Sequence, residues 1–201
     1  TCEVTVAPGV TLTVLPGTVV KAYYGNYSPC SITVYGHLLA QGTTEAPIVF
    51  TSIKDDEHAG DTNGDGTATV PAAADWQSVN FEAGSSGQLS HVRITYGGSW
   101  YFYDNEALLR CADADLSLDR VTLRSCNRAG LSARRCKLEV ANRTFAHVQN
   151  GLDIRGLAAG QPLALENNSF GPGAAGAVWF QGETHGAVSV RDNVVADGTT
   201  T

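Results

Sequence analysis

The stretch Leu118–Leu123, LDRVTL, decides the fold because four other segments in the second half of the chain align with it. The aligned segments are LSHVRI from Leu89, LDRVTL from Leu118, VANRTF from Val140, LENNSF from Leu165 and VRDNVV from Val190, and their starts are 29, 22, 25 and 25 residues apart. Turns and further short strands follow, as in GLSA at Gly130, GLDIRG at Gly151 and GAVWFQG at Gly176. In the first half, LTVLPGTVV from Leu12 is matched by ITVYGHLLA from Ile32, 20 residues further on.

The local pattern is that of short β-strands. Segments rich in β-branched residues alternate apolar and polar positions and are bounded by Gly, Pro, Asn or Asp, which is typical of strands. The predicted strands are Glu3–Val6, Thr11–Leu15, Thr18–Ala22, Ser31–Tyr35, Pro47–Ser52, Ser78–Glu82, Gln88–Tyr96, Ala114–Leu118, Lys137–Val140, Pro162–Leu165 and Ala187–Val190. No stretch keeps the apolar face of a helix, and 22 Gly residues would interrupt one.

The repeat predicts a parallel β-solenoid of about seven coils, with roughly three short strands in each coil. Inward-facing apolar side chains then stack on their equivalents about 4.8 Å above and below, and corner loops can vary in length without disturbing the stack. An antiparallel sandwich is the competing architecture, but it would show hairpin turns roughly every 8 to 12 residues. We therefore expect residues 1–201 to form one all-β domain.

The charge balance limits the classes of partner that the chain can bind. Twenty acidic residues against thirteen basic ones give a net charge of −7, which argues against nucleic acid and anionic membranes. No apolar run approaches the roughly 20 residues of a membrane span, so we expect no membrane insertion. Met is absent from the whole chain, position 1 included, so we expect a piece of a longer protein.

Residues 55–66, DDEHAGDTNGDG, concentrate negative charge in a chain that is otherwise sparingly charged. Asp61, Asn63 and Asp65 are spaced as in the opening of a calcium loop, where alternate residues point oxygen atoms at one centre. Gly64 and Gly66 allow the sharp turn that this arrangement requires.

The remaining calcium ligands have to come from around this motif. Thr67 at the seventh position offers a backbone carbonyl, whereas Ala72 at the twelfth excludes a true EF-hand. Asp55 or Asp56 before the loop, or Asp75 after it, would supply further carboxylates. The alternative is a solvated acidic loop. We expect the insertion at 54–75 to bind calcium in a structural role, and we expect His58 to be solvated.

The five cysteines contain no CxxC pair, which argues against a zinc site. Buried thiols and one or two disulfides are both open at this stage. Cys2 with Cys30, and Cys111 with Cys136, are the pairs that we consider.

The aromatic run Trp100, Tyr101, Phe102 and Tyr103 lies in a loop at 97–106, between two repeats. Such a loop either stacks on sugar rings or on a protein partner, or folds back over the solenoid. Trp179 and Phe180 would extend the same surface.

A catalytic site for polysaccharide cleavage would need a pair of carboxylates or a carboxylate with a nearby cation. Candidate pairs are Asp104 with Glu106 and Asp113 with Asp115, and candidate cations are Arg93, Arg110 and Arg155. These residues match no lyase or glycosidase motif, and the five His residues form no ligand cluster. We assign no catalytic residue.

One family has the same order of motifs. The chain runs from VTVAPGVTLTVLPGTVVKA (Val4–Ala22) through ITVYGHLLAQGTTEAPIVFTSIKDD (Ile32–Asp56), GDTNGDG (Gly60–Gly66) and ADWQSVNFE (Ala74–Glu82) to LSHVRITYGG (Leu89–Gly98). This order resembles right-handed parallel β-helix domains of bacterial secreted and surface proteins. The resemblance covers roughly residues 4–98, and it departs where Gln77 and Ser78 follow Trp76 in place of two glycines.

The resemblance implies a right-handed parallel β-helix and a bacterial secreted or cell-surface location. The family includes adhesins, surface arrays and polysaccharide-active proteins, so the fold alone does not select a function. We expect a non-catalytic, calcium-stabilised structural or adhesive module whose partner is a protein or a polysaccharide at the cell surface. The alternative is a carbohydrate-active β-helix enzyme, a polysaccharide lyase or a glycoside hydrolase.

Overall fold

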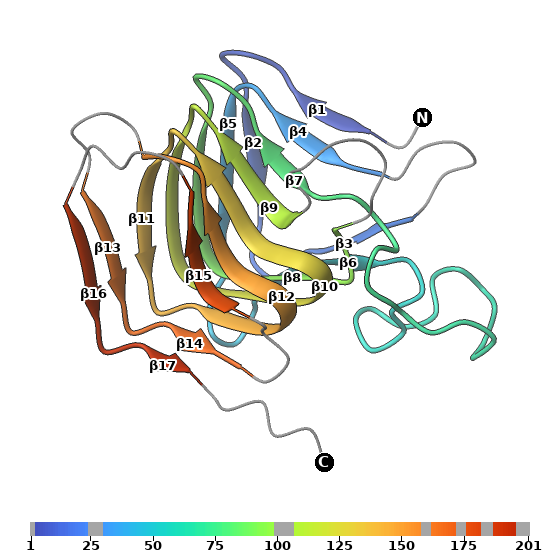
Figure 1. Cartoon of the computed structure of the whole chain (residues 1–201). Coiled ribbons are helices and arrows are strands. Elements are labelled where there is room, and N and C mark those ends of the chain that lie inside the picture. Colours follow the sequence, from blue (N-terminus) through green and yellow to red (C-terminus); the bar gives the residue numbers. More distant parts are fainter. Residues whose placement is uncertain are drawn as a thin grey trace.

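The strands form three parallel stacks that wind around one apolar core (Figure 1). The computed structural model describes residues 3–23, 30–98, 107–157, 162–171, 176–181 and 187–195, and these contain strands but no helix. Every pairing between the strands is parallel. The predicted all-β parallel β-solenoid is therefore confirmed.

Each stack takes one strand segment from every layer. The first stack contains β1 (Val4–Val6), β4 (Ile32–Val34), β7 (Val79–Phe81), β9 (Ala107–Ala112), the end of β10 (Asp115–Arg134), the end of β12 (Thr144–Ile154) and β15 (Gly176–Phe180). The second contains β2 (Thr11–Val14), β5 (His37–Gln41), the start of β8 (Ser86–Thr95), the start of β10, β11 (Lys137–Ala141), β13 (Leu163–Glu166) and β16 (Val188–Arg191). The third contains β3 (Val19–Ala22), β6 (Ile48–Ser52), the end of β8, the middle of β10, the start of β12, β14 (Ser169–Phe170) and β17 (Val194–Val195).

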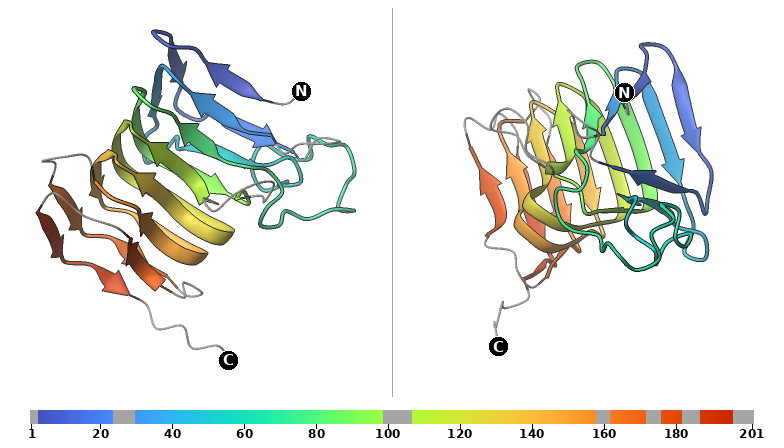
Figure 2. Two further views of the ribbon diagram at one scale, coloured as in Figure 1. Left: turned by 45° about the horizontal axis from the view of Figure 1, so that its top comes forward. Right: turned by 90° about the vertical axis from the view of Figure 1, so that its right-hand side faces the viewer.

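Within the described residues every stack contains seven strand segments, which agrees with the roughly seven coils predicted, and β1 and β17 lie at opposite ends of the solenoid (Figure 2). The register confirms the five-segment alignment residue by residue, because Leu89, Leu118, Val140, Leu165 and Val190 pair in succession. Except at the last layer, these side chains are buried in the core. They form one continuous apolar column.

The first-half alignment was wrong in register. Leu12 pairs with Leu38, whereas Ile32 pairs with Val4. Leu12 therefore belongs to the second stack and Ile32 to the first. The mistake has a physical source, since alternating Thr and apolar residues recur in strands of different stacks and do not say which stack a strand joins.

One corner between the second and third stacks is built alike in five layers. Its central residue has a positive φ of 49–62° in each, a left-handed conformation that makes a tight bend possible. These residues are His91, Arg120, Asn142, Asn167 and Asp192, the third position of each repeat. Asn168 and Asn193, which follow this corner in two layers, are bonded to each other, with Asn168 Nδ2 donating to Asn193 Oδ1 at 2.9 Å.

Arg143 breaks the apolar pattern at this corner. Its side chain is fully buried, and its register position falls between Val121 and Asn168. Within the part of the chain that the structure describes, the guanidinium nitrogens make no hydrogen bond, and the nearest carboxylate oxygen, Asp119 Oδ1, is 3.9 Å from Nη1. Burial lowers the pKa of Arg143 to about 9, although the charge of Asp119 opposes this shift.

Cys111 and Cys136 are joined by a disulfide across 25 residues, with their Cα atoms 6.3 Å apart. The bond ties the end of β9 to the segment that precedes β11, and so links two successive layers. Cys30 is also disulfide-bonded. Cys2, with which we expected it to pair, lies outside the described residues.

Candidate functional site

The acidic insertion leaves the solenoid between β6 and β7 and projects beside β3 and β6 (Figure 1). Residues 53–78 contain no strand. Lys21 on β3 holds the far part of the insertion, because its Nζ donates to the carbonyl oxygen of Gly60 at 2.6 Å. The insertion is therefore in contact with the coil stack.

Asp55 holds the first end of the insertion and is 2% exposed. Its Oδ2 accepts hydrogen bonds from Thr51 Oγ1 at 2.6 Å and from His58 Nδ1 at 2.8 Å, and its Oδ1 accepts from the backbone N–H of Glu57. Burial raises the pKa of Asp55, but these hydrogen bonds and the charge of His58 outweigh it, so the pKa lies below its usual value. The His58 ring is hydrogen-bonded to this buried carboxylate and its side chain is 21% exposed, so it is only partly solvated.

Asp75 and Trp76 hold the other end. Asp75 accepts hydrogen bonds from Ser52 Oγ and from Lys54 Nζ, both at 2.7 Å, and from the backbone N–H of Ala72. Trp76 is 1% exposed, and its indole nitrogen donates to the carbonyl oxygen of Thr95 at 2.8 Å. The residues just before β7 are thus fixed by both charge and apolar burial.

Asp61 organises the middle of the insertion. Its carboxylate accepts hydrogen bonds from the backbone N–H groups of Gly64 at 2.7 Å, Gly66 at 2.8 Å and Asp65 at 3.3 Å. The bond from Gly66 is the main reason that the pKa of Asp61 lies below its usual value. Gly64 and Gly66 have φ of 73° and 69°, so the turn that converges on Asp61 requires glycine at both positions.

Three carboxylates meet in this turn. Oxygen atoms of Asp56, Asp61 and Asp65 lie within 4.8 Å of one another. Oδ1 of Asp56 and Oδ1 of Asp65 are inaccessible to solvent and have no hydrogen-bond partner among the described residues. Buried carboxylate oxygens without a partner are costly, and a cation between them would remove that cost. Hard oxygen atoms at this spacing suit Ca²⁺, and further ligands would be carbonyl groups or water.

Two other predicted ligands lie beside this group. Asn63 Nδ2 donates to Asp65 Oδ2 at 2.8 Å, so the amide lies next to the three carboxylates. Thr67 is exposed on the same turn.

Asp55 and Asp75, which were also predicted as ligands, are not part of this group of three carboxylates. Their oxygen atoms are used to hold the two ends of the insertion against Thr51, Ser52 and Lys54. Of the two adjacent acids, Asp56 turns toward the loop and Asp55 turns toward the coils.

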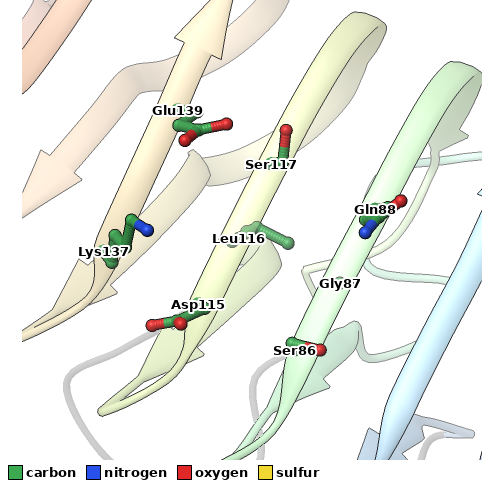
Figure 3. Close-up of a pocket in the computed structure, with 8 residues that line it drawn as sticks. All are labelled: Ser86, Gly87, Gln88, Asp115, Leu116, Ser117, Lys137 and Glu139. Carbon is green, nitrogen blue, oxygen red and sulfur yellow. The ribbon is translucent and has the colours of Figure 1, made fainter.

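A second feature is a shallow groove on the outward face of the second stack (Figure 3). It has a volume of about 210 Å³ and crosses three neighbouring strands, β8, β10 and β11. Its lining is Ser86, Gly87, Gln88, Asp115, Leu116, Ser117, Lys137 and Glu139. The sequence did not point to this groove, because it is formed by residues of three layers that only the register brings together.

The other predicted surfaces are only partly described. Trp100, Tyr101 and Tyr103 lie outside the described residues. Trp179 and Phe180 on β15 are 54% and 40% exposed and present aromatic surface near one end of the solenoid.

Several catalytic candidates on the described strands are engaged with other polar residues. Asp113 accepts two hydrogen bonds of 2.6 Å from Arg135, which lower its pKa, rather than facing Asp115. Arg155 forms an ion pair with Asp153 at 3.0 Å. Arg110 donates to Asn80 at 3.3 Å. Asp104 and Glu106 lie outside the described residues.

These parallel stacks with inserted loops define a parallel β-helix protein. The chain belongs to the family of pectate-lyase-like β-helix domains, whose model matches residues 1–108, the part that includes the acidic insertion. No curated protein and no solved structure matches the chain. Within the described residues there is no helix of the length and apolar character needed to cross a membrane.

Proposed function

We propose that this chain is a non-catalytic, calcium-stabilised β-helix module of a bacterial secreted or cell-surface protein. Its role is structural or adhesive, and its partner is a polysaccharide or a protein at the cell surface. Membership of a pectate-lyase-like family supports a relation to carbohydrate, while the site supports the calcium.

One observation carries the proposal: Asp56, Asp61 and Asp65 converge, and two of their oxygen atoms are buried without a partner. Without a cation, three negative charges would repel one another within one glycine-rich turn. With Ca²⁺ bound, the same carboxylates would hold the turn against the segment that begins at Asp55. The metal would therefore act as a brace between the insertion and the coils.

The disulfide supports an extracellular location. Disulfides persist in oxidising compartments and are rare where thiols are kept reduced. Extracellular calcium modules also bind with modest affinities, of about 10⁻⁴ to 10⁻³ M, which a site with few protein carboxylates would match.

The test is the thermal melt of the chain in CaCl₂ and in chelator. We expect a higher Tm in calcium, and we expect Asp65→Asn to remove most of that difference. Asp65 is a better position to change than Asp61, because Asp61 accepts three backbone hydrogen bonds that shape the turn, whereas the Asp65 carboxylate accepts bonds, among the described residues, only from the side chains of Asn63 and Thr69. Asp192→Asn, an exposed acid at a solenoid corner, is the matched control and should keep the wild-type response. Equal melts of the wild type in calcium and in chelator would reject the metal brace.

A glycoside hydrolase or lyase is the second candidate, and the groove favours it. Asp115 pairs in register with Lys137, and Glu139 lies two residues beyond Lys137 on the same face of β11. Strand spacings put the Cα atoms of Asp115 and Glu139 roughly 8 Å apart, and catalytic carboxyl groups of inverting glycosidases lie about 6.5–9.5 Å apart. Release of reducing ends or unsaturated products from a polysaccharide panel, abolished in Asp115→Asn, would establish this candidate in place of the non-catalytic module.

A further inference from the structure

The groove on the second stack continues along the axis of the solenoid. An adjoining hollow of about 390 Å³ shares Lys137 and Glu139 with it and reaches Asp119, Ala164 and Glu166. Together the two hollows cross β8, β10, β11 and β13. Three strand spacings give this trench a length of roughly 14 Å. Its shape therefore suits an extended chain that lies across the strands.

The charged groups Asp115, Lys137 and Glu139 of the trench are available to a ligand, whereas Asp119 already accepts hydrogen bonds from Arg120 and Asn142. Four carboxylates line it against one ammonium group, that of Lys137. No hydrogen bond or ion pair joins the side chains of Asp115, Lys137 or Glu139 to any described residue. Ser117 and Gln88 add groups that both donate and accept hydrogen bonds. The trench thus attracts positive charge and offers many polar contacts, whereas a polyanion would meet repulsion.

The backbone in the trench argues against a peptide strand. β8, β10, β11 and β13 each have a paired strand on both sides, so their N–H and C=O groups are already used. A peptide could not join the sheet by adding a strand, because that mode needs a free edge. Recognition here has to come from side chains alone, which suits a ligand that presents hydroxyl and amino groups.

We propose that the trench binds a cationic polysaccharide built from amino sugars with free amino groups. The carboxylates of Glu139 and Asp115 accept hydrogen bonds from the sugar ammonium groups, and Ser117 and Gln88 bond to hydroxyl groups. Lys137 donates to ring or bridging oxygens. This inference rests on the proposed non-catalytic, carbohydrate-related role and names its ligand.

The experiment is a calorimetric titration of the chain with a glucosamine hexamer, at a pH where its amino groups are protonated. The N-acetylglucosamine hexamer, a galacturonate hexamer and a lysine hexapeptide are titrated in parallel. We expect the glucosamine hexamer to bind at least tenfold more tightly than the other three. Glu139→Gln and Asp115→Asn should each weaken it about tenfold, the effect of losing one charge-assisted hydrogen bond. Glu45→Gln, an exposed acid outside the trench, is the control and should bind as the wild type does.

Three results would overturn the inference: tighter or equal binding of the uronate, equal binding of the lysine peptide, or no binding of the glucosamine hexamer. Repeating the titration in chelator separates this inference from the calcium brace. If Tm does not respond to calcium but the glucosamine hexamer still binds, only the calcium site is rejected. A calcium-dependent Tm without glucosamine binding would reject only the ligand.

Discussion

Replacing Arg143 by Met should stabilise the protein. The wild-type guanidinium is fully buried, makes no hydrogen bond, and has its nearest carboxylate, that of Asp119, at 3.9 Å. Met is unbranched and of similar length, so it can fill the same space without a charge. The change does not leave the Asp119 carboxylate without partners, because its side chain is 43% exposed and keeps hydrogen bonds from Arg120 and Asn142.

The size of the effect follows from the cost of burying the charge. A pKa lowered by burial to about 9 corresponds to a penalty of several kcal/mol on the charged form. Replacing buried ionic groups by apolar ones typically gains about 1–4 kcal/mol. We therefore expect the free energy of unfolding to rise by about 1–4 kcal/mol, and Tm by about 2–4 °C for each kcal/mol.

The pH dependence gives a second check. Below pH 9 Arg143 is charged in both the folded and the unfolded chain, so the full penalty applies. Above pH about 9 the folded chain releases a proton that the unfolded chain still keeps, so the stability of the wild type rises with pH relative to the variant. Chemical denaturation of both proteins at pH about 7 and about 10.5 measures this. The exposed Arg93→Met is the control, because Arg93 is on the surface and no contact links it to Arg143 or Asp119 among the described residues. The reasoning would be refuted if the variant were less stable than the wild type at pH 7. It would also be refuted if the difference in free energy of unfolding between the two proteins did not become smaller at alkaline pH.

The insertion and the disulfide give three further expected outcomes. Trp76→Phe loses the hydrogen bond to the Thr95 carbonyl and should lower Tm equally in calcium and in chelator, by the equivalent of about 1 kcal/mol; a loss confined to calcium would contradict this. The double variant Cys111→Ala/Cys136→Ala removes a link across 25 residues and should cost about 3–4 kcal/mol in chemical denaturation, so an unchanged midpoint would count against it. Asp55 has a lowered pKa, so its contribution is complete above pH ~4 and is lost as pH falls through the lowered value. The Tm of the wild type should fall more steeply below pH ~4 than that of Asp55→Asn, and parallel curves would exclude this role.

The strand register of the second half of the chain could be predicted residue by residue, whereas that of the first half could not. Because five copies of one pattern all align in the same way, the alignment gives the strand register, as the column from Leu89 to Val190 shows. With only two copies, the match of Leu12 to Ile32 had no third copy to test it. Arg143 was not predicted to be buried, because burial of a charged residue depends on neighbours in adjacent layers and not on its own strand.

The motif at the centre of the candidate metal site could be recognised in the sequence, whereas the choice of the neighbouring acidic residue that joins it could not. The spacing of Asp61, Asn63 and Asp65 is a local property of one turn, so the motif located it. Whether Asp55 or Asp56 joins them depends on which of two adjacent side chains faces the coils, and Thr51 and His58 decide that through space. The trench could not be predicted at all, since its residues come from four layers whose loops differ in length.

A crystal structure of the chain grown in CaCl₂, with anomalous data, tests the central claim most directly. We predict one peak in the acidic insertion, with carboxylate oxygens of Asp56, Asp61 and Asp65 about 2.3–2.6 Å from the ion. An insertion without such a peak, in crystals where the three carboxylates are well ordered, would contradict the calcium-braced β-helix.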